Sequence, residues 1–253
     1  MVVEATRVEE LARELEGQHP GDVLKLALQE YGERLAISFS GAEDVVLLAM
    51  ATHEAERLGT SFRVFTLDTG RLHGETYRFL ETVQERYGVT IEAFFPQPAA
   101  VQALVREKGY FSFYDGGHQE CCSIRKVEPL RRALAGAPAY VTGQRRDQSP
   151  GTRNAVPMVQ LDEGFAEPGS TLVKFNPLAG WSSAQVWRYI REHEVPYNPL
   201  HDSGFRSIGC EPCTRATHPG EHEREGRWWW EEATRKECGL HAINLADERS
   251  AQP

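Results

Sequence analysis

Cysteine is scarce in this chain, with five among 253 residues. A small and odd number argues against a disulfide framework and favours metal binding or catalysis. No apolar run is long enough to span a membrane, and the charged start "MVVEATRVEELARELEG" lacks the basic-then-apolar pattern of a signal peptide. We therefore expect a cytoplasmic protein, without membrane contact, in a compartment that keeps thiols reduced.

An excess of positive charge is also lacking. The formal net charge of −9 argues against a general nucleic-acid-binding surface. Basic residues are nevertheless bunched in "SIRKVEPLRR", "GQRRDQSPGTR" and "REGRWWWEEATRK". Any one of these clusters is typical of a solvated face. Local arginine clusters in an acidic chain suit a small anionic ligand better than a polyanion.

Strand and helix patterns alternate along the first 150 residues. Strands are predicted at 34–40, 62–68, 89–95 and 139–144, and helices at 6–16, 21–31, 43–59, 75–87 and 126–136, the last with Pro129 near its start. This alternation predicts βαβ units around a parallel sheet. Residues 156–178 indicate two short strands around a turn, and 182–195 a helix capped by Ser182 or Ser183.

The chain shows no internal repeat and no linker. The pattern loosens beyond Pro150, and the chain is loop-rich after Pro196. We therefore expect one α/β domain in three parts: N-terminal helices at 1–32, the α/β part at 33–195 and a C-terminal extension at 196–253.

Three polar loops follow predicted strands: "SFSGAEDV", "LDTGRLHGETY" and "TGQRRDQSPGTR". The carboxyl ends of parallel strands meet at one edge of a sheet, so these loops should converge. The first could hold an anion through backbone N–H groups and the helix dipole, or be an ordinary strand-to-helix turn; it lacks the Walker A lysine. Arg145, Arg146 and Arg153 in the third can fork onto phosphate or sulfate oxygens.

Four of the cysteines form two close groups. Cys121 and Cys122 are adjacent, and Cys210 and Cys213 make a C-x-x-C pair. Four thiols so grouped predict a site for zinc or an iron–sulfur cluster, although C-x-x-C alone could be a redox pair. Neighbouring side chains diverge, which is awkward for a compact tetrahedral zinc and modestly favours the larger cluster.

The fifth cysteine, Cys238, lies near the C-terminus. Arg235, Lys236 and His241 are close in sequence, and positive charge favours the reactive thiolate. The alternative is a buried or incidental cysteine, but Gly239 and the polar surroundings favour an exposed, mobile segment.

With these motifs in view, the chain resembles the assimilatory adenylyl-sulfate (APS) and 3′-phosphoadenylyl-sulfate (PAPS) reductases. "SFSGAEDV" resembles the modified pyrophosphate-binding loop of that family, "TGQRRDQSPGTR" its arginine loop, and "ECGLH" its catalytic-cysteine segment. "CCSIRK" and "GCEPC" match the branch that carries a [4Fe-4S] cluster and prefers APS. The resemblance covers nearly all of residues 33 to 241.

The resemblance implies an adenine-nucleotide α-hydrolase-like (PP-loop) fold, with 33–195 as the nucleotide-binding part. It implies Cys238 as the nucleophile and thioredoxin or a similar dithiol protein as partner, with AMP as product. The nucleotide pocket would be lined by Ser38, Ser40, Asp44, Leu67 and Gly143. The phosphosulfate or its path would be surrounded by Lys126, Arg153, Arg224, Arg227, His118 and His241. The cluster ligands would be Cys121, Cys122, Cys210 and Cys213, with Lys126 between cluster and substrate.

The implied reaction reduces APS to sulfite through a Cys S-sulfonate, in sulfate assimilation towards cysteine. Use of PAPS, or of both substrates, stays open. So do a PP-loop ATP-dependent ligase or sulfurtransferase, and a zinc-stabilised nucleotide-binding module without catalysis. A homo-oligomer also stays open.

Overall fold

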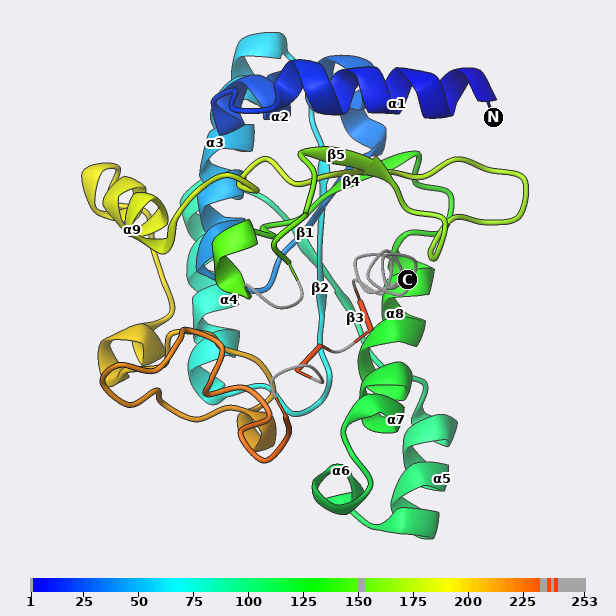
Figure 1. The fold of residues 1–253 in the computed structure, drawn as a ribbon, viewed down its shortest axis with the longest axis vertical. Helices are drawn as coiled ribbons and strands as arrows, with labels where there is room; N and C mark the ends of the chain where they lie inside the picture. The colour runs from blue at the N-terminus through cyan, green and yellow to red at the C-terminus, as the bar shows by residue number, and fades with distance from the viewer. Residues whose placement is uncertain (1, 150–152, 233–235, 238, 241–253) are drawn as a thin grey trace, which may run out of the picture.

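The computed structural model describes residues 2–149, 153–232, 236, 237, 239 and 240. Its centre is a six-stranded sheet in the order β3-β2-β1-β4-β6-β5 (Figure 1). All neighbouring strands run parallel except β5 and β6, which are antiparallel. The strands are β1 Leu35–Ser38, β2 Arg63–Leu67, β3 Ile91–Phe94, β4 Ala139–Val141, β5 Val159–Leu161 and β6 Val173–Phe175. The predicted α/β class and parallel sheet are confirmed.

The helices predicted from apolar spacing, other than the one at 126–136, are present with ends shifted by a few residues. The α-helices in the described part are α1 Val2–Leu15, α2 Pro20–Tyr31, α3 Ala42–Leu58, α4 Gly74–Tyr87, α5 Pro98–Lys108, α6 Ser112–Asp115, α7 Gln119–Cys122, α8 Glu128–Ala133 and α9 Ser183–Glu192. Gly59 ends α3 in the left-handed region at φ 64°, which glycine adopts without strain. Ser182 caps α9 by accepting a hydrogen bond from Gln185 N.

Both faces of the sheet are buried. In β1, Leu35 and Ile37 belong to a large core that also contains residues of α2 and α3. Ala36 points to the opposite face, where it joins Tyr140 of β4 and Leu130 of α8 in a second core. Successive residues of a strand face opposite sides, so this alternation gives helices on both faces of the sheet.

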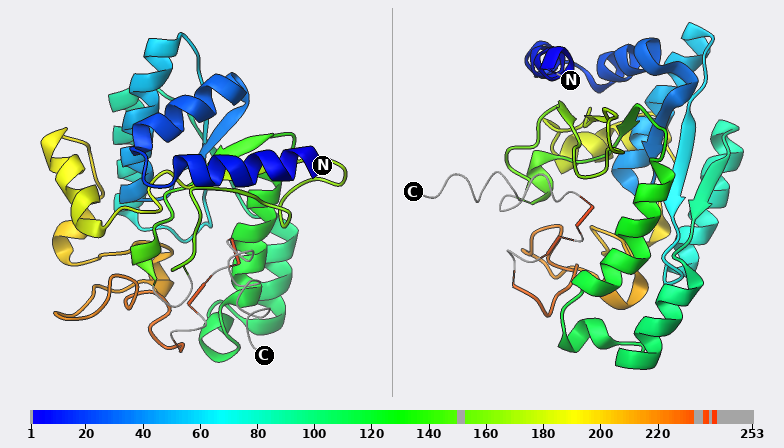
Figure 2. Two further views of the ribbon diagram at one scale, coloured as in Figure 1. Left: turned by 45° about the horizontal axis from the view of Figure 1, so that its top comes forward. Right: turned by 90° about the vertical axis from the view of Figure 1, so that its right-hand side faces the viewer.

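The strand order reverses between β1 and β4, which are neighbours although β2 and β3 intervene in sequence. In open α/β sheets this is where ligands bind, at the carboxyl ends of the strands. The loop-rich extension, orange in Figure 1, lies at the end of the molecule opposite α1 and α2, and Figure 2 shows the same arrangement. It is tied to the loop after β2, because Glu211 N donates to Arg71 O at 2.8 Å and Leu72 pairs with Cys210.

Two helical segments differ from the sequence prediction. Helix α5 had no predicted counterpart; Leu104 is its one fully buried residue, so apolar spacing gave little signal. The helix expected at 126–136 instead begins at Gln119 and contains a π-helical turn, Ser123–Val127, just before Pro129. Proline is therefore tolerated inside a continuous helical run, because it opens the segment that follows the widened turn.

Among the described residues, no helix is both long and apolar enough to cross a bilayer.

Candidate active site

Asp44 ties together the loops that follow β1 and β4. Its Oδ2 accepts from Ser40 N and Ser40 Oγ at 2.8 Å each and from Gly41 N at 3.0 Å, and its Oδ1 accepts from Gly143 N at 3.0 Å. Burial, reinforced by the neighbouring Glu43, raises the pKa of Asp44 to about 6 against the effect of these donors. The sequence allowed this loop to hold an anion with its backbone N–H groups. The structure commits two of those groups to Asp44 instead.

Gly143 is where the two loops approach most closely. A Cβ atom there would lie 2.5 Å from Asp44 Oδ1 and 2.5 Å from Glu43 Cβ. No side chain fits in that space, so glycine is required by close approach rather than by backbone conformation.

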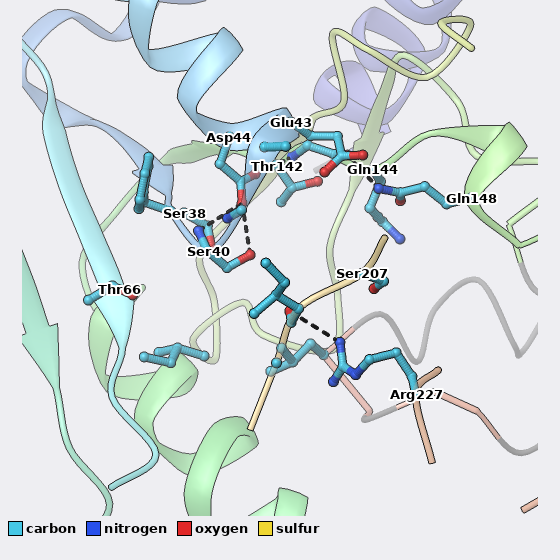
Figure 3. A pocket seen from close by; sticks show the side chains of 18 of the residues that line it. Ser38, Ser40, Glu43, Asp44, Thr66, Thr142, Gln144, Gln148, Ser207 and Arg227 are labelled. Carbon is cyan, nitrogen blue, oxygen red and sulfur yellow. Dashed lines mark hydrogen bonds between the residues drawn. The ribbon is translucent and has the colours of Figure 1, made fainter. Parts of the chain in front are cut away.

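A cavity of about 200 Å³ opens at these strand ends (Figure 3). Figure 3 shows Asp44 and Ser40 on one side and Ser207 and Arg227, from the C-terminal extension, on the other. Nine of the residues expected around the substrate line it: Ser38, Ser40, Asp44, Leu67, Lys126, Gly143, Arg153, Arg224 and Arg227. His241 lies outside the described residues, as does Cys238.

The loop after β2 links the cavity at the strand ends to the cysteines. Asp68 Oδ1 accepts from Gly70 N at 2.8 Å and from Tyr77 Oη at 2.9 Å. Burial, with this hydrogen bond, raises the pKa of Tyr77 to about 12. Thr69 Oγ1 lies 3.2 Å from Cys210 Sγ. A polar turn beside the first loop was expected, and here it also reaches the C-x-x-C pair.

The arginine loop does not present three arginines to the cavity. Arg145 is 1% exposed and is held between Glu43 and Glu223, each 2.9 Å from its Nη2. Burial alone would raise the pKa of Glu43, but Arg145 outweighs it and the pKa of Glu43 is lowered. Arg146 points away to Glu16 at 2.7 Å. Neither Arg145 nor Arg146 lines the cavity, which argues against the prediction that they fork onto substrate oxygens. Arg153 does line it, although Glu237 also holds its guanidinium.

The four clustered cysteines surround a second, smaller cavity of about 10 Å³ with His118, Arg71, Arg125 and Lys126. None of the four is in a disulfide. Burial raises the pKa of Cys213 to about 12 and also raises that of Cys121, whereas Lys126 and Thr69 outweigh burial at Cys210 and lower its pKa. Among the described residues, no three His, Cys, Asp or Glu side chains are placed to hold a single metal ion.

The two cavities share walls. Lys126, Cys210 and Trp228 line both. Trp228 is 1% exposed, and its backbone is in the left-handed region at φ 40°, uncommon for a bulky residue. Lys126 Nζ lies 5.5 Å and Arg227 Cζ 4.5 Å from the centre of its ring. Lys126 therefore lies between the cysteines and the larger cavity, and its place beside a substrate stays a prediction.

His118 lies apart from the residues with which the sequence grouped it. It is fully buried, lines the cysteine cavity and not the larger one, and stacks on Trp228 with ring centres 4.2 Å apart. A role in substrate binding stays a prediction, but its contacts are with protein groups.

Sequence reasoning missed Trp228, Glu43, Glu223 and Glu237 as parts of the site. The run of three tryptophans at 228–230 was a usable signal, because so many large aromatic rings in a row require a reason. The glutamates gave no signal of their own, since charged residues are common in loops and in the first turns of helices, and their arginine partners are distant in sequence.

The fold and the two cavities define an α/β protein with a mostly parallel sheet, in which a cavity at the strand ends adjoins a smaller one lined by cysteines. The chain belongs to the family described as the phosphoadenosine phosphosulfate reductase domain, whose model matches residues 34–216.

The chain is 58% identical over 235 residues to an adenosine 5′-phosphosulfate reductase of Pseudomonas aeruginosa (strain LESB58), covering 93% of this chain and 86% of that protein. It is 55% identical over 249 residues to the chloroplastic 5′-adenylylsulfate reductase 3 of Arabidopsis thaliana, covering 97% of this chain and 54% of that protein. The chain thus spans about half the length of this plant relative.

Solved structures agree on the fold. A phosphoadenylyl-sulfate reductase from Candida auris, in a phosphate complex, matches with a TM-score of 0.66 and 27% identity, covering 82% of this chain and 96% of that one. An FMN adenylyltransferase from Candida glabrata matches with a TM-score of 0.55 and 15% identity, covering 98% and 91%. At that identity the second likeness shows the fold alone.

Proposed function

We propose that this chain reduces APS to sulfite and AMP with electrons from a dithiol protein. One observation carries the proposal. Lys126, Arg153, Arg224 and Arg227 gather on one cavity at the β1–β4 strand ends, beside four grouped cysteines. The likeness to reductases named for this substrate supports it.

The adenosine end of the substrate would lie against the strand ends. Ser38, Ser40, Leu67 and Gly143 offer small polar and apolar surfaces there, and Asp44 fixes their loops. The phosphosulfate would then extend towards the basic side chains. This division suits a ligand with a neutral base at one end and concentrated negative charge at the other.

The first chemical step is a displacement at sulfur. The Cys238 thiolate forms a bond to the sulfate sulfur while the bond from that sulfur to the AMP phosphate oxygen breaks, and AMP leaves with the electron pair. The thiolate must approach an anion, so the cationic groups offset charge that would otherwise repel it. The product is an S-sulfonate on Cys238.

The second step transfers two electrons from the partner. A thioredoxin thiolate attacks Cys238 Sγ, and sulfite leaves with the electrons of the broken S–S bond. The second thioredoxin thiol resolves the mixed disulfide, which restores the Cys238 thiolate and leaves thioredoxin oxidised. Sulfur is reduced from the sulfate to the sulfite level, and the dithiol is the reductant.

Cys121, Cys122, Cys210 and Cys213 would hold a [4Fe-4S] cluster, and what supports this is the donor set, four free thiols around one small cavity. Buried thiols with a raised pKa resist ionisation in an empty site, and metal binding replaces those protons. Arg71, Arg125 and Lys126 around them suit an anionic group. When bound, the cluster would supply a fixed negative charge beside Lys126, which lines the substrate cavity as well. The four free thiols around the cysteine cavity favour a reducing compartment such as the cytoplasm.

Activity measurements on anaerobically purified protein test the proposal. Sulfite release with thioredoxin should occur with APS at a higher kcat/KM than with PAPS, since that ratio measures discrimination. A higher value with PAPS would reassign the substrate. ATP consumption without sulfite release would point to a ligase or sulfurtransferase and overturn the proposal.

A further inference from the structure

The two residues that directly precede Cys238 in the chain are buried and firmly held, in contrast to the exposed, mobile segment expected from the sequence. The Glu237 carboxylate accepts from Arg153 Nε at 2.8 Å and Nη2 at 3.1 Å. Arg224 Nη2 donates to the carbonyl oxygen of Lys236 at 2.8 Å. Lys236 Nζ lies 2.7 Å from Glu225 Oε2. A segment held through both its side chains and its main chain has little freedom at this point.

His118 provides the main-chain anchor at Glu237. Its Nε2 lies 2.9 Å from the Glu237 carbonyl oxygen, and because a carbonyl only accepts, Nε2 donates. The ring is fixed from two other sides. Glu231 Oε2 lies 2.7 Å from Nδ1, and Trp228 stacks on the ring face. His118 is therefore rigid and aimed at the backbone of Glu237.

Arg153 is equally fixed. Its Nη1 donates to Gln148, so its guanidinium is held on the cavity side while Nε and Nη2 grip Glu237. Arg153 and Glu237 side chains are 8% and 6% exposed, and little water competes for the pair. An ion pair so well shielded, with bidentate geometry, can hold a chain segment in place.

We propose that Glu237 is a positioning residue for Cys238: Arg153, which lines the cavity, holds its side chain, and His118 holds its main chain, so the point from which the chain continues to Cys238 is fixed. The inference deepens the proposed function and rests on it. In this proposal His118 holds the main chain at Glu237 and does not contact the substrate. Arg153 then also has a partner within the chain.

The test separates substrate binding from the first displacement. Glu237→Gln keeps the shape of the side chain and removes the charge that binds Arg153. His118→Gln replaces the imidazole that donates to the Glu237 carbonyl oxygen with a side chain of shorter reach. We expect each to slow S-sulfonate formation from saturating APS, without thioredoxin, by about tenfold or more, as loss of orientation does. The KM for APS and the Kd for AMP should stay within about twofold. The double variant should be less impaired than the product of the two effects, since both act on one segment.

Glu232→Gln is the matched control, an exposed glutamate in the same stretch, and it should behave as the unchanged protein. Iron content should be retained in all variants. A Glu237→Gln protein with unchanged rate, or with raised KM and unchanged rate, would overturn the proposal.

If the protein forms no S-sulfonate from APS, the proposed function is wrong, but the positioning role of Glu237 can still be tested. Amide hydrogen exchange provides that test. Amides at 236–240 should exchange at least tenfold faster in Glu237→Gln and in His118→Gln than in the unchanged protein. Equal protection in all of them would overturn the positioning role.

Discussion

At the residue scale, close approach and pairing of charges shape the cavity more than any single motif does. Asp44 binds two loops at once, and Arg145 is locked between two glutamates that come from opposite ends of the chain. Such contacts fix the walls before any substrate arrives. Catalysis by fixed charges depends on this, because groups already in place need no reorganisation during the reaction.

Gly143→Ala should damage the nucleotide side of the cavity. The added Cβ would meet Asp44 and Glu43 at 2.5 Å, so the loop must shift. We expect AMP to bind at least about tenfold more weakly, and the free energy of unfolding to fall by about 1–3 kcal/mol, as overpacking typically costs. Calorimetry and urea unfolding measure these. Gly180→Ala is the control, since Gly180 is exposed and a Cβ there meets nothing within 4 Å. Equal AMP affinity in both variants would contradict this account of Gly143.

Lys126→Met should impair the chemical step. Its amine lines both cavities and is buried, so its charge acts where little water screens it. Losing one such cation at a developing negative charge typically costs about 10²–10³ in kcat. Single-turnover S-sulfonate formation measures this, with iron content as a check. The exposed Lys108, paired at the surface with Glu120, gives the control Lys108→Met. Activity of Lys126→Met within threefold of that control would remove Lys126 from the mechanism.

At the scale of elements, strand ends and a widened helical turn bring the site residues together. The turn Ser123–Val127 buries both Arg125 and Lys126. π-Helical turns inside α-helices are frequent at functional sites because they redirect side chains. The adjacent cysteines at 121 and 122 lie in the last turn of α7, immediately before this turn.

Strand β6 carries a buried lysine that makes stability depend on pH. Lys174 pairs in register with Tyr140 of β4, and burial lowers its pKa to about 8 from 10.5. Between these values the unfolded state binds more protons than the folded state, so stability rises with pH. We expect the free energy of unfolding, relative to Lys174→Met, to rise by about 2 kcal/mol between pH 8 and pH 10. Urea unfolding of both proteins measures this difference. Because both have the same cysteines, the effect of thiol titration cancels between them. A difference independent of pH would contradict the burial of a charged lysine.

The elements were largely predictable from the sequence, while the contacts between them were not. Apolar spacing located β1, β2, β3 and β4, and their order in the chain placed three loops at one edge. Helix α5 was not predicted because it is mostly exposed and so has little apolar spacing. The Arg145–Glu223 pair joins residues 78 positions apart, and His118 reaches Glu237 over 119 positions. No local sequence pattern encodes such pairings. The sequence therefore could not predict which carboxylate each arginine of the arginine loop would bind.

At the scale of the whole molecule, the C-terminal extension completes the site. It supplies Cys210 and Cys213 to the cysteine cavity and Arg224, Arg227 and Trp228 to the larger cavity at the strand ends. Sequence positions near 40, 120, 143 and 227 must therefore fold together before either cavity exists. Both cavities should be lost together on unfolding.

The four grouped cysteines should be required together for iron binding. Changing any one of Cys121, Cys122, Cys210 and Cys213 to Ser should lose iron and most activity, since a [4Fe-4S] cluster takes one thiolate per iron. Iron and sulfide analysis of anaerobically purified protein checks this. Cys238→Ser is the control and should keep its iron. Full iron in all four variants would refute the assignment.

The central claim is that Cys238 takes the sulfonate from APS, and mass spectrometry tests it most directly. The anaerobic protein is mixed with APS without thioredoxin, digested and mapped. We predict one added sulfonate, on the peptide containing Cys238, with AMP released in equal amount; Cys238→Ser should bind AMP normally and form no adduct. An adduct on another cysteine, or turnover by the Ser variant, would contradict the account.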